Sequence, residues 1–97
     1  MSPLVLLLCL VIRSEEVTFT NPVLNTDHPD PGVVLLHDGT AYLAVLSSGE
    51  SPDTFPLMES RDLVSWTDMG NVFPNKSWPD WVSSKMWAPE VHHVGGK

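Results

Sequence analysis

The sequence predicts an all-β fold. Nine prolines are spread along 97 residues, and each opposes a long helix because its ring disrupts the helical hydrogen-bond pattern. Short runs of β-branched and apolar residues are separated by polar turn residues, which is the pattern of a turn-rich β domain. The dipeptide Asp38-Gly39 stands between two such runs and is typical of the turn of a β-hairpin.

Four strands follow one another in this pattern, and a fifth begins near the C-terminus. The first two flank Asp38-Gly39 and are apolar on both faces, which indicates a hairpin enclosed within a larger structure. Gly70 marks a bulge or bend in the fourth strand. The polar stretch at residues 60–63 predicts a turn, and Gly95-Gly96 predicts another. The expected strands cover residues 33–37, 40–46, 55–59, 66–73 and 87–94.

A four-stranded antiparallel sheet is the repeat unit, or blade, of a β-propeller. Here one such sheet is followed by the opening of a second. One blade cannot bury its own faces, and repeat architectures need several stacked units. The sequence stops directly after the Gly95-Gly96 turn, without the strand that would return from it. We therefore expect an N-terminal fragment that holds the first blade and the start of the second, and we expect it to fold weakly and to aggregate.

Residues 4–12 form an uninterrupted apolar run, LVLLLCLVI. A membrane-spanning helix needs about 20 residues, so this run is too short and instead fits the core of a secretory signal. We expect a signal peptide over residues 1–14 and a secreted, extracellular domain over residues 15–97. The alternative is a buried strand or helix at the domain edge. Cys9, the sole cysteine, lies inside the run, so the mature domain would hold no disulfide and no thiol.

The charge balance excludes some partners. Twelve acidic residues against five Lys and Arg give a formal net charge of −7. A protein surface that binds nucleic acid needs clustered basic residues, and a surface that binds an anionic membrane needs them as well. We therefore expect neither a nucleic-acid partner nor a membrane partner.

Asp30 is the candidate catalytic residue, because it stands between two prolines in His28-Pro29-Asp30-Pro31-Gly32. Each proline fixes its own φ and restricts the residue before it, so we expect the backbone around Asp30 to be stiff and extended. A stiffly held carboxylate is what a positioned general base requires. The alternative for this segment alone is a proline-rich turn with a solvated aspartate.

Five sequence pieces follow one another along the chain: NPVL at 21–24, HPDPG at 28–32, HDGTAYLAVLSS at 37–48, FPLMESRDLVSWTDMG at 55–70 and MWAPEVHHVGGK at 86–97. In this order and spacing they resemble glycoside hydrolase family 43. The members of this family are five-bladed β-propeller enzymes that act on arabinose- and xylose-containing glycans. The chain departs from the family pattern at Gly32, where serine is more usual, and in the loop at 47–54, which lacks the tryptophan of some xylosidase-like members.

The resemblance implies inverting hydrolysis of an oligo- or polysaccharide, with Asp30 as the general base. Trp87, in the Trp-Ala-Pro-acid motif, and Phe55, an aromatic position in the first-blade loop, would be substrate-binding residues. The family's second aspartate and its glutamate general acid have no matching region in this chain, and Glu90 belongs to the second-blade motif instead. No cofactor is required, although a structural calcium is an expectation for the full-length protein, with ligands from later blades.

Two other functions stay open at this point: a non-catalytic carbohydrate-binding propeller and an inactive truncated fragment. The β-fructosidases share the five-bladed fold, but their Asn-Asp-Pro-Asn motif does not match HPDPG. Trp66 is interpreted as a structural anchor. Trp78 and Trp81 either line the cleft or pack between blades. His28 is expected to form a hydrogen bond near the base. His92 and His93 would point to opposite faces of a strand, so they could not easily bind the same metal ion.

Overall fold

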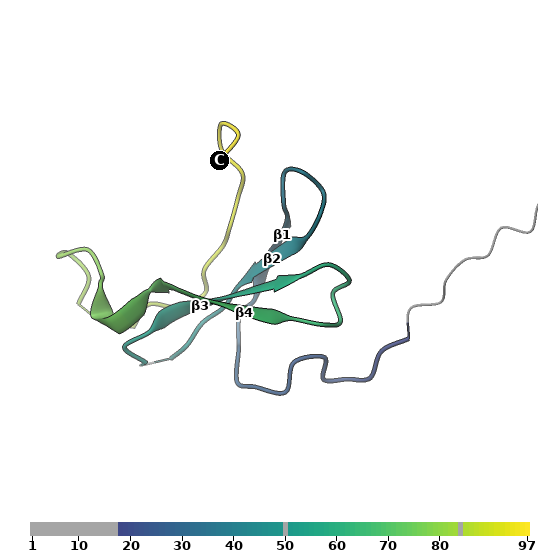
Figure 1. The fold of residues 1–97 in the computed structure, drawn as a ribbon. Helices are drawn as coiled ribbons and strands as arrows, with labels where there is room; N and C mark the ends of the chain where they lie inside the picture. Colours follow the sequence, from purple (N-terminus) through teal and green to yellow (C-terminus); the bar gives the residue numbers. More distant parts are fainter. Residues whose placement is uncertain (1–17, 50, 84) are drawn as a thin grey trace, which may run out of the picture.

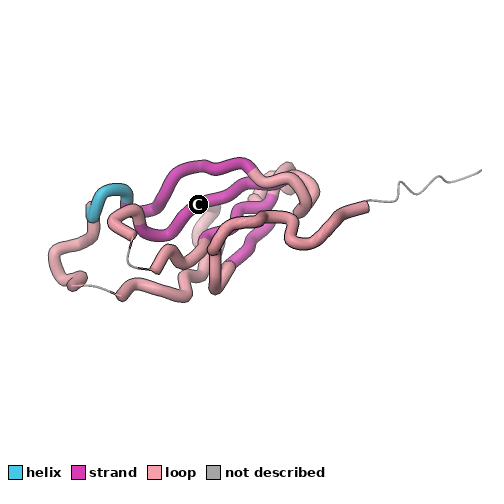
Figure 2. Tube along the Cα trace, turned by 90° about the horizontal axis from the view of Figure 1, so that it is seen from below, coloured by secondary structure: helices cyan, strands magenta, loops and turns pink. Residues whose placement is uncertain are grey.

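The structure, a computed structural model, describes residues 18–49, 51–83 and 85–97. The predicted signal peptide lies outside the described residues. Four strands form one antiparallel sheet in the order β1-β2-β3-β4, which confirms the all-β prediction and matches a single propeller blade (Figures 1 and 2). The elements are β1 (Gly32–Leu35), β2 (Tyr42–Val45), β3 (Thr54–Ser60), β4 (Thr67–Phe73) and a 3-10 turn, η1 (Pro74–Lys76).

The hairpin between β1 and β2 turns at Asp38-Gly39, as the sequence predicts. The Gly39 N–H donates to the Leu36 carbonyl oxygen at 2.8 Å, and Gly39 has φ +71°, a left-handed conformation that suits glycine. One carboxylate oxygen of Asp38 accepts hydrogen bonds from the N–H and the hydroxyl of Thr40, at 3.0 and 2.7 Å. The turn is therefore stabilised locally, without help from the rest of the sheet.

The turn and the bulge predicted for the second hairpin are both present. Asp62 Oδ1 accepts the backbone N–H groups of Val64 and Ser65 at 2.9 and 2.8 Å, which closes the turn between β3 and β4. The pairing shifts by one residue along β4, so an extra residue is accommodated near Gly70. Gly70 has φ +91°, and its N–H donates to Asp68 Oδ1 at 2.8 Å.

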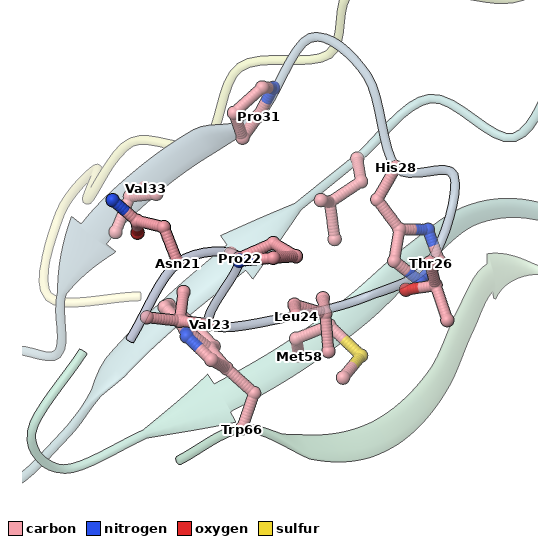
Figure 3. A pocket seen from close by; sticks show the side chains of 12 residues that line it. Asn21, Pro22, Val23, Leu24, Thr26, His28, Pro31, Val33, Met58 and Trp66 are labelled. Carbon is pink, nitrogen blue, oxygen red and sulfur yellow. The ribbon is translucent and has the colours of Figure 1, made fainter. Parts of the chain in front are cut away.

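The core is small and lies on one face of the sheet. Ala44, Leu46 and Met58 are buried there, and Leu24 and Trp66 pack against them. This packing confirms Trp66 as a structural anchor. Leu24 belongs to residues 21–28, which lie over this face, and its side chain is close to Met58 and Trp66 in the pocket drawn in Figure 3.

The opposite face of the sheet is covered by residues 89–90. Successive side chains of a strand alternate between faces, so Gly32 points away from the side that Val33 shares with Ala44. A Cβ added at Gly32 would meet the Pro89 carbonyl oxygen and the Glu90 Cα. The β1–β2 hairpin is thus partly covered on both faces, in keeping with its apolar pattern.

The prediction of a fifth strand over residues 87–94 is wrong. No strand is assigned there, because within the described part of the chain no segment offers these residues a ladder of backbone hydrogen bonds. Ala88 has φ +57°, outside the extended conformation, and its N–H donates to a side chain. The segment instead runs beside β1, where the His93 ring donates to the Leu35 carbonyl oxygen at 2.8 Å (Figure 1). The Gly95-Gly96 turn is present, closed by reciprocal bonds between Val94 and Lys97.

The loop after β4 is tied back to the start of β3. The Trp78 indole N–H donates to the buried hydroxyl of Thr54 at 2.8 Å, and the Asn75 N–H donates to Asp53 Oδ1 at 2.8 Å. Trp78 therefore has a structural contact inside this blade, whereas Trp81 is 85% exposed. Among the described residues, no helix has the length and apolar character needed to cross a membrane.

Acid should weaken the turn between β3 and β4. Hydrogen bonds from the Ser65 and Val64 N–H groups lower the pKa of Asp62 below its usual 3.8. Because the folded-state pKa is depressed, the stabilisation is present above that usual value and is lost as pH falls through the lower, folded-state pKa. When the pH is lowered from about 7 to about 2.5, the unfolding temperature of Asp62→Asn should therefore fall by less than that of the wild type.

Thermal unfolding followed by circular dichroism at the two pH values measures this difference. Asp80→Asn is the control, since Asp80 is exposed and its carboxylate makes no hydrogen bond within the described residues. An equal acid-induced drop in the wild type and in Asp62→Asn would contradict the assignment.

Candidate functional site

The antiparallel register brings three chain segments to one end of the sheet. Gly32, at the start of β1, pairs with Val45 at the end of β2, and Val45 pairs with Leu57 near the start of β3. Asp30, just before β1, and Ser47, just after β2, therefore meet at this end. Phe55, the second residue of β3, lies at the same end of the sheet.

Asp30 is exposed, and Ser47 holds both its carboxylate and the backbone just before it. The prediction of an extended backbone at Asp30 is wrong, because its φ is +54°, a left-handed conformation that aspartate tolerates better than most residues. The Ser47 hydroxyl donates to Asp30 Oδ2 at 3.2 Å. One residue earlier, the Pro29 carbonyl oxygen accepts the Ser47 backbone N–H at 3.0 Å. Two bonds to Ser47 thus fix the backbone and the side chain of this segment together.

Ser47 also reaches the far end of the chain. Its hydroxyl oxygen accepts the Ala88 N–H at 2.8 Å, although the two residues are 41 positions apart in the sequence. Only 2% of Ser47 is exposed. A serine hydroxyl has one proton to donate and lone pairs to accept, so one group serves both partners. The carboxylate of Asp30 and the backbone next to Trp87 are therefore joined through a single buried side chain.

Gly32 lets these segments approach closely. A Cβ at this position would lie 2.8 Å from the Pro89 carbonyl oxygen, closer than real Cβ atoms come, and 3.3 Å from the Glu90 Cα, which is a tight contact. Between β1 and this segment lies an open hollow. It is lined by Asp30, Pro31, Gly32, Val33, Ala88, Pro89, Glu90, Val91 and His92.

The aromatic candidates lie around this hollow but do not line it. Trp87 is 70% exposed and borders a separate depression with Gly49, Lys85 and Met86. Phe55 is half-buried, and its ring centroid lies 6.2 Å from that of Phe73. The structure therefore joins Asp30 to the backbone beside Trp87, and it leaves both rings outside the hollow that Asp30 lines.

Comparison with known proteins places the chain in a family. The sequence model of glycosyl hydrolases family 43 matches residues 19–97. The chain belongs to glycosyl hydrolases family 43. This membership confirms the resemblance carried by the five motifs.

A relative described as a beta-xylosidase, from Formosa agariphila, is 38% identical over 87 residues. The match covers 80% of this chain but only 14% of that relative, so the chain spans a small part of the longer protein. No solved structure matches the chain significantly.

His28 does not take the place expected for it. Its ring lies on the core side of the sheet, near Thr26 in the pocket drawn in Figure 3. Its Nδ1 is buried and, within the described residues, has no hydrogen-bond partner. The prediction that His28 forms a hydrogen bond near the base is therefore wrong. The preceding segment crosses the core face and carries His28 with it.

The paired histidines bind different partners. The His92 ring lies 3.0 Å from a Glu90 carboxylate oxygen, and both side chains are exposed. The His93 ring donates to the Leu35 carbonyl oxygen. In the ranges that the structure describes, no three His, Cys, Asp or Glu side chains gather closely enough to hold a metal ion.

Sequence reasoning missed Ser47. In the sequence it is the first residue of a Ser/Gly/Asp-rich loop, and such residues are usually solvated turn formers. The available signal was its position, directly after an apolar strand that pairs with the strand following HPDPG. A small polar residue there is forced to the same sheet end as Asp30.

Replacing Gly32 with alanine should displace residues 88–90 while leaving the sheet intact. The added methyl group would overlap the Pro89 carbonyl oxygen, which is backbone and cannot rotate away. We expect the Ala88 amide to lose hydrogen-exchange protection by roughly tenfold or more, whereas amides of β2 and β3 keep theirs.

Nuclear magnetic resonance measures both sets of amides in one experiment. Val33→Ala is the matched control, because Val33 is the next residue of β1 and faces the other side. Unchanged Ala88 protection in Gly32→Ala would contradict the close packing of these segments.

Proposed function

We propose that this chain is the general-base portion of a glycoside hydrolase that cleaves O-glycosyl bonds in xylose- or arabinose-containing glycans with inversion. Family membership and the beta-xylosidase relative support the hydrolase class and a carbohydrate substrate. The observation that carries the proposal is the exposed Asp30 carboxylate, held by Ser47 at the edge of an open hollow.

In the proposed reaction Asp30 acts on a water molecule. The water oxygen forms a bond to the anomeric carbon while its proton passes to Asp30. The glycosidic carbon–oxygen bond breaks, and the leaving oxygen takes a proton from a general acid on the other side of the sugar. Ser47 engages only Oδ2, so Oδ1 is left for the water.

The general acid belongs, in this proposal, to another part of the whole protein. Inverting enzymes keep their two carboxyl groups about 6.5–9.5 Å apart so that the water fits between substrate and base. Glu90 lines the same hollow as Asp30 but is exposed and lies 3.0 Å from the His92 ring. An exposed carboxyl beside an imidazole lacks the apolar surroundings that keep a general acid protonated.

Trp87 is the proposed sugar platform. Pyranose and furanose rings have apolar faces, and an indole that is 70% exposed offers a flat apolar surface beside the Asp30 hollow. Phe55 is proposed as a second aromatic border, since β3 brings it to the same sheet end. Secretion through the leader at residues 1–14, and activity without a required cofactor, stay predictions.

Asp30→Asn should abolish most hydrolysis of aryl β-D-xylosides and aryl α-L-arabinofuranosides by the protein encoded by the complete reading frame. Removing a general base costs about 10²–10⁴ in kcat, and asparagine keeps the size of the side chain. Release of the aryl alcohol measures kcat, and proton nuclear magnetic resonance identifies the anomer first released. The inverted anomer is expected.

The control is Asp27→Asn, because Asp27 is an exposed acid three residues earlier and should leave kcat unchanged. Full activity in Asp30→Asn, or release of the retained anomer, would contradict the proposed role.

The 97-residue chain on its own should not turn over either substrate. It carries one of the three carboxylates that the family uses, and a base without its acid gives little catalysis. Purified chain incubated with the aryl glycosides tests this expectation. Turnover that Asp30→Asn removes would show that the chain supplies its own acid.

A further inference from the structure

We propose that Ser47 is a positioning residue that ties the Asp30 carboxylate to the backbone beside Trp87. The proposal rests on the proposed function for the roles of Asp30 and Trp87. The contacts themselves do not depend on it. The predicted base and the predicted sugar platform then move as one unit, although they come from segments far apart in the sequence.

The direction of each hydrogen bond follows from chemistry. The Ala88 N–H can only donate, so the Ser47 oxygen accepts it at 2.8 Å. The hydroxyl proton is then free for Asp30 Oδ2, at 3.2 Å. The third bond, from the Ser47 N–H to the Pro29 carbonyl oxygen at 3.0 Å, fixes the serine backbone. All the hydrogen-bonding groups of Ser47 except its carbonyl are thus engaged by the two segments that it joins.

Burial makes this arrangement specific. Ser47 is 2% exposed, and a buried hydroxyl that loses a partner is destabilised because water cannot replace it. The next residue offers a contrast. Ser48 also has a buried hydroxyl, but within the described residues that hydroxyl has no hydrogen-bond partner. The two neighbouring serines therefore differ in contacts while sharing the same loop and the same chemistry.

The link responds to the protonation state of Asp30. A carboxylate is a stronger acceptor than a neutral carboxyl group, so the Ser47 hydroxyl is held most firmly while Asp30 is ionised. When Asp30 takes a proton, the hydroxyl is released and the bond to Ala88 weakens with it. The Ala88 amide should therefore report the titration of Asp30.

The experiment follows the protein encoded by the complete reading frame by nuclear magnetic resonance over a pH titration. In the wild type, the Ala88 amide proton shift should follow the same midpoint as the Asp30 carboxyl carbon. Ser47→Ala should flatten the Ala88 curve and speed Ala88 hydrogen exchange by roughly tenfold or more, with sheet amides unchanged. Ser47→Thr keeps the hydroxyl and should restore both properties.

Three further variants isolate the link. Ser48→Ala is the matched control and should behave as the wild type. Asp30→Asn should remove the Ala88 titration. Glu90 and His92 line the same hollow as Asp30 and also titrate, so Glu90→Gln and His92→Gln must leave the Ala88 curve in place.

Several results would overturn the proposal. The first is an Ala88 titration curve that is the same in Ser47→Ala as in the wild type. The second is an Ala88 amide that exchanges in the wild type as fast as an unpaired amide. The third is a loss of hydrogen-exchange protection in Ser47→Ala that is spread equally over the sheet. The last would make Ser47 a purely structural residue. If the Ala88 amide proton shift follows the Asp30 midpoint but Asp30→Asn keeps full hydrolytic activity, the proposed function fails. The hydrogen-bonded link through Ser47 then still stands.

Discussion

Between Gly32 and Pro89 there is no room for a single methyl group, since a Cβ at Gly32 would lie 2.8 Å from the Pro89 carbonyl oxygen. This close approach sets where residues 88–90 lie, and therefore where the Ala88 N–H meets Ser47. The consequence of this contact is a Trp87 segment held against the start of β1.

The site depends on a sheet that has little core of its own. Three buried side chains, Ala44, Leu46 and Met58, form the cluster on one face, and the other face relies on the Pro89 segment. Such a sheet is stabilised mainly by its local turns and by the segments laid across it. Asp30 stands at the junction, because the chain passes from the core-face segment into β1 through Pro29-Asp30-Pro31. Packing on both faces therefore determines the position of one carboxylate.

Features that depend on local chemistry could be predicted from the sequence. The strands, the Asp38-Gly39 turn, the polar turn at Asp62 and the irregularity at Gly70 all follow from residues close to one another. Features that depend on distant contacts could not. The sequence predicts a strand over residues 87–94, but strand pairing needs a partner, and Ala88 instead meets a serine 41 residues away. Ser47 looked like a loop residue for the same reason, and His28, expected near the base, lies in the pocket on the core face.

The packing of Gly32 against residues 89–90 is the central claim, and an intramolecular nuclear Overhauser effect tests it directly. The account predicts a strong cross-peak between the Gly32 and Glu90 α-protons, alongside the cross-strand peak between Gly32 and Val45 that reports an intact β1–β2 pair. A spectrum that contains the Gly32–Val45 peak but lacks the Gly32–Glu90 peak would contradict the account. The sheet would then exist without the segment that carries Trp87 to Asp30.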